Sequence, residues 1–284
     1  IRPFLLREDE VKAAPSNIKL SDTKPKAGEY KFTMSVSPLD CMGCGECITV
    51  CPKAADGAIK MVPQESQAAE QPVFDYLVAN VGKKDSGFAD TTPKGSQFNQ
   101  PLLEFSGSCA GCAETSYARL ITQLFGEQMY ISNATGCSSI WGNSSPSTPY
   151  TVNPQGRGPA WSNSLFEDNA EFGYGMLLAQ NTIRERLKAS VEKLAENGAN
   201  DDVKAAAQEY LDTFSVGATN GTATDKLVKA LEDCDCGCAE RAELLKNKDF
   251  LAKKSQWIFG GDGWAYDIGF GGVDHVLASG QDIN

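Results

Sequence analysis

The chain has 284 residues, 41% of them hydrophobic, and its 26 basic and 37 acidic residues give a formal net charge of −11. This acidic excess argues against a nucleic-acid partner or an anionic membrane surface. No apolar run reaches 18 residues, and the N-terminus lacks the basic and apolar regions of a signal peptide. We therefore expect a cytoplasmic protein with one small and one large domain.

The ten cysteines fall in short-spaced groups. They are too few for a disulfide scaffold in a chain of this length, and their grouping is typical of metal binding in a reducing compartment.

The first predicted element is a strand over residues 28 to 38, where apolar and polar residues alternate, with residues 59 to 62 as its expected partner. Between them lies the run C-M-G-C-G-E-C-I-T-V-C-P, which has the two-two-three cysteine spacing of a [4Fe–4S] cluster in bacterial-type ferredoxins. Its cysteines are Cys41, Cys44, Cys47 and Cys51.

Two glycines, Gly43 and Gly45, allow this run a tight turn that directs three thiolates towards three irons of one cube. The fourth cysteine points away and, in two-cluster ferredoxins, ligates the other cluster. A structural zinc site would instead separate two C-x2-C units, and a disulfide framework would belong to a small secreted chain. The run predicts an electron-carrying iron–sulfur site.

After the cluster run, residues 63 to 101 are polar and rich in Gln, Lys, Gly and Pro, apart from V-F-D-Y-L-V at 73 to 78. We interpret residues 71–100 as a surface linker between a small domain at 1–70 and a larger domain at 101–284.

The larger domain begins with a predicted helix after Cys112, followed by a short strand over residues 129 to 132. A possible capping box of Ser164 and Glu167 predicts the start of a long helix through Leu187. It opens a helical insertion at about 165–255, whose exposed face is a solvated charge surface.

We expect breaks within this insertion at residues 197–200 and 217–221. A buried strand at 257–259 and a glycine-rich turn and helix at 266–277 follow. The expected fold class is an α/β domain with a parallel sheet and a helical insertion, preceded by a small α+β ferredoxin-like domain.

A second cysteine group consists of Cys109 and Cys112 in C-A-G-C, with Cys137 after the next strand. Three thiols at these positions fit three corners of a further cluster. C-x-x-C also occurs in redox dithiols and as buried free cysteines, so the spacing leaves these alternatives open.

The sequence Gly260-Gly261-Asp262-Gly263 follows the last predicted strand, where open α/β sheets bind ligands. An Asp between glycines suits a hard cation such as Mg²⁺ that holds a diphosphate. A tight turn without a ligand is the alternative.

Four stretches resemble the thiamine-diphosphate domain of pyruvate:ferredoxin (flavodoxin) oxidoreductases. They are F-S-G-S-C-A-G-C-A-E-T, N-A-T-G-C-S-S-I-W-G, G-P-A-W-S-N-S-L-F-E-D and W-I-F-G-G-D-G-W-A-Y-D-I-G. Residues 1 to about 70 resemble the two-cluster ferredoxin-like domain of the same family. The resemblance covers nearly the whole chain except the helical insertion.

The resemblance implies a role in an enzyme of anaerobic metabolism that oxidatively decarboxylates pyruvate with coenzyme A to acetyl-CoA and CO2. Electrons would pass through [4Fe–4S] clusters to ferredoxin or flavodoxin, and the complete enzyme would be a homodimer. A related 2-oxo acid:ferredoxin oxidoreductase and a non-enzymatic iron–sulfur electron carrier are the alternatives.

The resemblance also assigns residues. Glu114 would hydrogen-bond the aminopyrimidine ring of thiamine diphosphate, and Asp262 would ligate Mg²⁺, with Gly263 and Trp264 in the same loop. The cluster nearest the thiamine would be held by Cys109, Cys112 and Cys137. The two outer clusters would use Cys41, Cys44, Cys47 and Cys51.

Three features depart from the family pattern. The partner cysteine run of the ferredoxin-like domain is expected upstream of residue 1. The remaining Mg²⁺ ligands and the fourth cysteine of the inner cluster are expected beyond Asn284, so the fragment alone is expected to be inactive. Cys234, Cys236 and Cys238 match no family ligand, and we expect them to be unligated or to bind metal only adventitiously.

The single histidine, His275, lies in an apolar segment and is expected to be a helix residue with a local hydrogen bond, not a catalytic base. Trp141 and Trp161 lie in loops that either roof a cofactor pocket or pack as ordinary loops.

Overall fold

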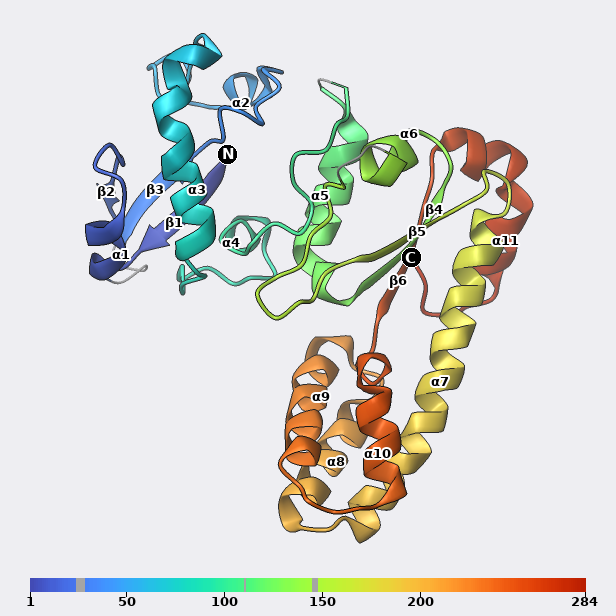
Figure 1. Ribbon diagram of the computed structural model, residues 1–284. Coiled ribbons are helices and arrows are strands. Elements are labelled where there is room, and N and C mark those ends of the chain that lie inside the picture. The colour runs from blue at the N-terminus through green and yellow to red at the C-terminus, as the bar shows by residue number, and fades with distance from the viewer. Residues whose placement is uncertain (24–28, 110, 145–147) are drawn as a thin grey trace. The chain divides into compact units, whose positions relative to one another are not determined.

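The computed structural model describes residues 1–23, 29–109, 111–144 and 148–284 (Figure 1). Gly28, where the first predicted strand begins, and Ala110 of C-A-G-C lie outside the described residues. None of the helices in the described part of the chain combines the length and apolar character that crossing a bilayer requires.

The chain forms two compact units. One contains Ile1–Gly126 and Ile140–Gly156, and the other contains Glu127–Ser139 and Arg157–Asn284. This division differs from the expected one, because the segment before residue 127 is held to the small unit by contacts that composition does not reveal.

The first unit contains a three-stranded antiparallel sheet in the order β1-β3-β2. Its strands are β1 (Arg2–Leu6), β2 (Ser21–Asp22) and β3 (Lys31–Ser35). Strand β3 lies within the predicted strand, but its partners are β1 and β2, so the expected pairing with residues 59–62 is wrong. Burial explains the difference, because Leu6 is fully buried whereas Met61 and Val62 are exposed.

The beginning of the expected linker is a helix, α3 (Gln71–Asn80). Its Val73 and Leu77 form one apolar cluster with Phe4 and Leu6 of β1. Helix α3 is thus part of the core of the first unit, and Val73, Phe74 and Leu77 of the V-F-D-Y-L-V stretch are its buried residues.

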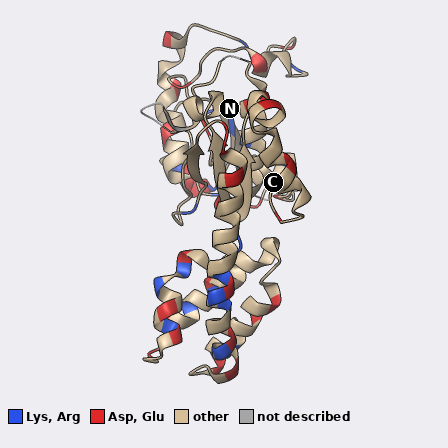
Figure 2. Ribbon diagram, turned by 90° about the vertical axis from the view of Figure 1, so that its right-hand side faces the viewer, with Lys and Arg blue, Asp and Glu red and all other residues tan. Residues whose placement is uncertain are grey.

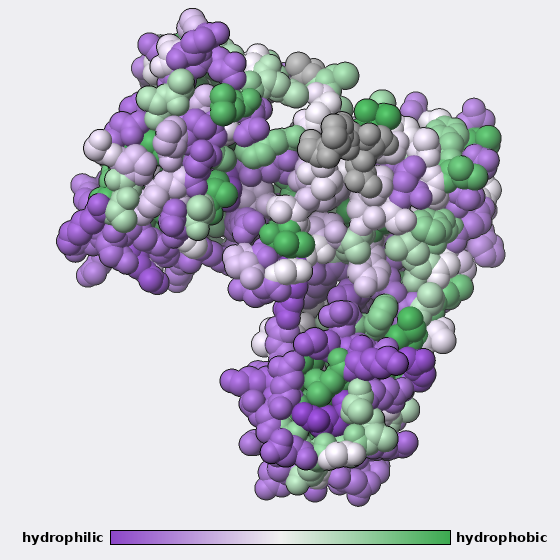
Figure 3. Space-filling view, in the orientation of Figure 1, coloured by the Kyte–Doolittle hydropathy of each residue, from purple (hydrophilic) through white to green (hydrophobic). Residues whose placement is uncertain are grey.

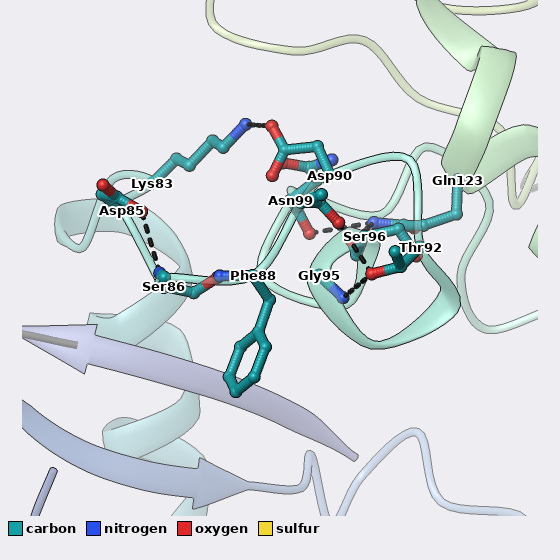
Figure 4. Close-up of polar contacts among 12 residues, drawn as sticks. Lys83, Asp85, Ser86, Phe88, Asp90, Thr92, Gly95, Ser96, Asn99 and Gln123 are labelled. Atoms are coloured by element: carbon teal, nitrogen blue, oxygen red, sulfur yellow. Dashed lines mark hydrogen bonds and ion pairs between the residues drawn. The ribbon is translucent and has the colours of Figure 1, made fainter. Parts of the chain in front are cut away.

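The rest of the expected linker is fixed by polar contacts (Figure 4). Lys83 pairs with Asp90, and Thr92 caps the short helix α4 (Pro93–Ser96) by accepting from the Gly95 N–H at 3.1 Å. Gln123 of helix α5 (Ala113–Phe125) donates to the carbonyls of Ser96 at 2.6 Å and Asn99 at 3.1 Å. These bonds anchor the segment to α5.

Other helices of the first unit are short: α1 (Glu8–Ala13), α2 (Glu46–Thr49), the 3-10 helix η2 (Gln64–Glu70) and the π-helix η4 (Ile140–Ser144).

The second unit contains a parallel sheet in the order β5-β4-β6, as the sequence predicts. Its strands are β4 (Met129–Ala134), β5 (Ala160–Ser164) and β6 (Ser255–Phe259). The first half of α7 (Asn169–Asn197) packs on the sheet and on α11 (Phe270–Ala278). The predicted strands at 129–132 and 257–259 and the helix after Cys112 are confirmed.

The predicted capping box is wrong. Ser164 is the last residue of β5, and α7 begins at Asn169 after Asp168, which makes no side-chain cap. The Ser164 hydroxyl bonds instead to the Asn169 side chain at 3.0 Å. The Ser164 hydroxyl therefore makes a tertiary hydrogen bond in place of the helix cap that the local pattern predicts.

The second half of α7 forms a helical segment with α8 (Asp201–Thr213), α9 (Gly217–Glu232) and α10 (Ala239–Lys246). These four helices enclose their own apolar core. The break at 197–200 is confirmed, with Asn200 capping α8 through the Val203 N–H at 2.8 Å. The second break falls before Gly217, which is already helical, and not at 217–221.

The outer faces of this helical segment are polar. Acidic and basic residues alternate on them (Figure 2), and hydrophilic residues cover most of the face shown in Figure 3. Ion pairs such as Lys226 with Glu209 and Lys248 with Glu232 lie at this surface.

A buried arginine of α7 links this helix to two other stretches of the helical segment. Arg184 of α7 donates to the carbonyl of Leu251 at 3.2 Å and to that of Phe214 at 2.8 Å. The buried Tyr210 hydroxyl donates to the same Leu251 carbonyl at 2.9 Å. Burial is the main cause that lowers the pKa of Arg184. We call these residues the Arg184 clasp.

Candidate functional site

The cysteine run at 41–51 forms an open loop around the single turn of α2. Cys41 and Cys44 are exposed, and Cys47 and Cys51 are half-buried. Gly43 and Gly45 have φ of 72° and 79°, a region in which residues with a Cβ are strained. The predicted glycine turn is therefore present, and it leaves the thiols accessible.

Helix α3 positions the start of this loop. The Ser37 hydroxyl bonds to Asp40 at 2.5 Å and to Gln71 at 2.9 Å, and the Leu39 N–H donates to the same Gln71 side chain at 3.2 Å. The Cys41 N–H then donates to the Ser37 carbonyl at 3.1 Å. No motif in the sequence indicates this role of Gln71, which lies thirty residues after Cys41 in the expected linker.

Among the described residues, no three His, Cys, Asp or Glu side chains converge closely enough to hold a single metal ion. An iron–sulfur cube is bound through separate irons at its corners, so its thiolates stand apart around the cluster. A glycine turn with accessible thiols fits such a cube better than a single ion.

The C-A-G-C group forms a second turn in the first unit. The Cys112 N–H donates to the Cys109 carbonyl at 3.1 Å, and Gly111 has a φ of 72°. Cys112 is the N-cap of α5, and Glu114 lies in the first turn of that helix. Cys109, Cys112 and Glu114 thus lie at the start of one helix.

The two cysteine turns of the first unit approach each other. A Cβ on Gly111 would lie 3.4 Å from Oε1 of Glu46, the residue that begins α2 and precedes Cys47. Gly111, which precedes Cys112, is therefore in contact distance of the Glu46 side chain in the cluster loop.

Tyr150, which the sequence analysis missed, lies close to Glu114. Its pKa is raised, first by burial and second by the negative charge of Glu114. Its hydroxyl has no hydrogen-bond partner among the described residues, and neither has the indole N–H of Trp141, whose ring centroid is 6.3 Å away. Such unpaired buried groups are uncommon and require an explanation.

In the second unit, the carboxyl edge of the parallel sheet gathers the other predicted residues. Cys137 begins the short helix α6 (Cys137–Ser139) just after β4. Gly260 to Gly263 directly follow β6, the neighbour of β4. This edge is where open α/β sheets bind their ligands.

A single buried amide holds the three strand ends together. Asn169 accepts from Ser132 of β4 at 2.5 Å and from Ser164 of β5 at 3.0 Å, and it donates to the Phe259 carbonyl of β6 at 2.8 Å. No local sequence pattern indicates this role, because its partners lie up to ninety residues away.

Within the acidic glycine loop, Asp262 is exposed and available as a ligand, whereas Trp264 is only 6% exposed. Trp264 lies between two glycines, since a Cβ on Gly260 or on Gly269 would approach its ring to 2.3 Å. The Trp264 ring therefore packs against the backbone of the loop, and the Asp262 side chain is exposed to solvent.

Cys137 belongs to the second unit, and Cys109 and Cys112 belong to the first. Their assignment to one cluster stays a prediction, as do the roles of Asp262 and Gly263.

The other residues singled out in the sequence are one histidine and two loop tryptophans. His275 is in α11, as expected, and its ring meets Tyr174 edge-on at 6.1 Å. Trp141 is buried beside Tyr150, and the indole N–H of Trp161 is buried without a partner among the described residues.

The comparison with protein families agrees with the cluster loop. The family described as "4Fe-4S binding domain" matches residues 34–55, which include all four cysteines of the run. The chain therefore contains a ferredoxin-type iron–sulfur domain.

Its relatives extend this assignment to the whole chain. It is 51% identical to a pyruvate-flavodoxin oxidoreductase of Klebsiella pneumoniae, over all of this chain and 24% of that protein. It is 49% identical to the pyruvate:ferredoxin oxidoreductase of Moorella thermoacetica, over all of this chain and 25% of that one. A pyruvate dehydrogenase [NADP(+)] of Cryptosporidium parvum is 43% identical, with 16% of its length covered.

The chain is thus homologous over its whole length to pyruvate-flavodoxin and pyruvate:ferredoxin oxidoreductases, and it spans about a quarter of their length.

Proposed function

We propose that this chain is the electron-relay segment, with part of the thiamine-diphosphate domain, of an enzyme that oxidatively decarboxylates pyruvate with coenzyme A to acetyl-CoA and CO2. The 4Fe-4S match and the relatives' names support the class of enzyme. The electron acceptor would be ferredoxin or flavodoxin.

The approach of the two cysteine turns is the observation that carries this proposal. Glu46 stands beside Cys47 and comes to within contact distance of the Gly111 backbone between Cys109 and Cys112. Clusters bound at the two turns would be neighbours. An electron could then pass from the inner cluster, on the side of its Cys109 and Cys112 ligands, to an outer cluster.

The first unit would also supply the proton chemistry. Glu114 would exchange a proton with a ring nitrogen of the aminopyrimidine of thiamine diphosphate, a cofactor that stabilises a carbanion at the reacting carbon when it is bound. The unpaired, buried Tyr150 hydroxyl near Glu114 is a donor for which a bound polar group would provide the acceptor.

The second unit would hold the diphosphate. Asp262, exposed at the carboxyl edge of the sheet, offers the hard oxygen ligand that Mg²⁺ prefers. Gly263 allows backbone approach, and Trp264 keeps the loop in shape. A non-enzymatic electron carrier would need neither Glu114 nor this loop.

The relatives' names agree on pyruvate and differ in the acceptor, which is flavodoxin, ferredoxin or NADP(+). We therefore propose pyruvate as the substrate ahead of other 2-oxo acids.

The electron relay is tested by Cys47→Ser in the complete enzyme. Release of CO2 from pyruvate in a single turnover should persist, because Cys47 has no proposed role in thiamine chemistry, whereas steady-state reduction of ferredoxin should fall to background. Cys236→Ser is the matched control and should leave both rates unchanged. Full ferredoxin reduction by the Cys47→Ser enzyme would contradict the relay.

The cofactor assignment is tested by Asp262→Ala, with Asp267→Ala, an exposed acidic residue of the same segment, as the control. Removing the ligand leaves the diphosphate charge poorly compensated, so tight thiamine-diphosphate binding should be lost in the first variant only. Calorimetric titration of each variant with thiamine diphosphate in the presence of Mg²⁺ measures this affinity. Wild-type affinity in Asp262→Ala would identify the loop as a turn without a ligand.

Glu114→Gln keeps the size of the side chain and removes its exchangeable proton. Turnover should fall by about 10²- to 10⁴-fold, as is typical of general acid–base groups, with unchanged iron content. An unaltered rate of C2 proton exchange on the bound cofactor would exclude Glu114 from this role.

A further inference from the structure

The third cysteine group lies in the turn between α9 and α10. The sulfurs of Cys236 and Cys238 are 2.9 Å apart, and both residues are half-buried. Less than about 1 Å separates this distance from the ~2.05 Å of a disulfide bond. The turn therefore holds two accessible thiols ready to join.

Cys234 differs from its two neighbours. It is 4% exposed and belongs to the apolar core of the helical segment. Its sulfur also accepts a hydrogen bond from the Cys236 N–H at 3.3 Å. Packing and this bond fix Cys234 in place, so it is unsuited to thiol exchange.

We propose that Cys236 and Cys238 form a redox-active dithiol that is oxidised to an intramolecular disulfide by a low-molecular-weight disulfide. This site is separate from the iron–sulfur ligands, and it does not depend on the function proposed above.

The reaction is two successive thiol–disulfide exchanges. The thiolate of Cys238 attacks one sulfur of RSSR, the S–S bond of RSSR breaks, and the first RS⁻ leaves with the electron pair. Cys236 then loses its proton and attacks the Cys238 sulfur of the mixed disulfide, which releases the second RS⁻. Two protein thiols are oxidised, and RSSR is reduced to two RSH.

The contacts around Cys236 assign the order of attack. Cys236 is in contact with both other cysteines of the turn, whereas Cys238 is the N-cap of α10 and lies at the end of the turn. Hydrogen bonds to Cys238, first, and to Cys234 raise the pKa of Cys236 to about 11, so Cys236 keeps its proton until the second step.

The charge around the turn selects the oxidant. Asp233 and Asp235 are exposed and adjoin the cysteines in the sequence, whereas Glu232 is paired with Lys248. Like charges disfavour close approach, so a cationic disulfide should react in preference to an anionic one. Cystamine is therefore the probe, and oxidised glutathione is the comparison.

The test uses the full chain, reduced and then incubated anaerobically with cystamine. The remaining thiols are alkylated, and the chain is cleaved after Lys229 and Arg241, which leaves all three cysteines in one peptide. Fragmentation should show a Cys236–Cys238 disulfide with Cys234 alkylated. The chain unfolded in urea is the control and should give a mixture of pairings.

Variants then check the mechanism. Cys236→Ser should accumulate a mixed disulfide with cysteamine on Cys238, whereas Cys238→Ser should form neither this adduct nor the intramolecular bond. Cys234→Ala should still form it, and circular dichroism verifies that this variant is folded. If it is not, the pairing pattern of the wild-type chain decides.

Three results would overturn the proposal: the same mixture of pairings in the folded and unfolded chains, a stable mixed disulfide that never closes, or protection of all three thiols from alkylation by Cd²⁺. The last would assign the turn to metal binding. Faster reaction with oxidised glutathione than with cystamine would overturn the selection by charge.

Discussion

Two cysteine-rich turns of this chain, the Cys41–Cys51 loop and the Cys234–Cys238 turn, differ in backbone and in packing. The first contains two glycines of positive φ and exposes Cys41 and Cys44. In the second, Gly237 has no such φ, and Cys234 is buried in the core between helices. In the first turn, C-x-x-C spacing on left-handed glycines leaves Cys41 and Cys44 exposed. In the second, C-x-C spacing between α9 and α10 buries Cys234 and brings the sulfurs of Cys236 and Cys238 together.

The comparison teaches that cysteine density alone does not define a cluster site. The handedness of the backbone between the thiols and the core beneath them decide whether sulfur is available to iron, to another sulfur or to neither.

Replacing single cysteines should give the largest difference between the two turns, measured as iron and sulfide content. In the complete enzyme, Cys44→Ser should remove the cluster held by the first turn, because serine is a poor ligand for these irons. Cys238→Ser should leave the iron content unchanged. Iron and sulfide analysis with low-temperature electron paramagnetic resonance measures both variants, and equal losses would remove the distinction between the turns.

Truncating one apolar side chain near each turn should cost more unfolding free energy at the second turn, which lies on a buried core. Leu231 is fully buried at the end of α9, so Leu231→Ala should cost about 2–5 kcal/mol in the free energy of unfolding of the helical segment. Val50, which is 75% exposed in the cluster loop, should cost at most about 0.5 kcal/mol when changed to Ala. Urea denaturation followed by circular dichroism compares them; a similar cost for both would mean that the cluster loop has a core of its own.

A pair of glycine substitutions isolates the backbone. A Cβ on Gly45 or on Gly237 would meet nothing within 4 Å, so the two positions differ in φ and not in space. Gly45→Ala should destabilise its turn by roughly 1–2 kcal/mol and reduce iron incorporation. Gly237→Ala should be neutral or stabilising by up to about 1 kcal/mol. Iron uptake during anaerobic reconstitution is the measurement, and unimpaired uptake by Gly45→Ala would show that the left-handed turn is dispensable.

Local patterns in the sequence were sufficient for several elements. The cysteine spacing, the helix after Cys112 and the strands at 129–132 and 257–259 all follow from periodicity or motif, and so does the parallel sheet. Each of these signals lies within one short window of the chain.

The failures have a common cause, which is contact over long separations. The strand at Arg2–Leu6 pairs with β3, and its Phe4 and Leu6 pack on Val73 and Leu77 of α3, some seventy residues away. Ser164 was predicted to cap a helix, but Asn169 takes its hydroxyl into the network at the sheet edge. Gln71 supports the start of the cluster loop and Asn169 joins the three strands of the parallel sheet, both through partners that no local window contains.

Helix α7 runs from the parallel sheet into the helical segment as 29 residues, about 43 Å long, and the Arg184 clasp fixes its middle to neighbouring chain segments (Figure 1). Such a rod acts as a lever. A tilt of about 5° at the end that contains Asn169 would move the far end by roughly 4 Å for that length. Small adjustments at the carboxyl edge of the sheet would thus be amplified at the tip of the helical segment, where a fluorophore could report them without touching the site.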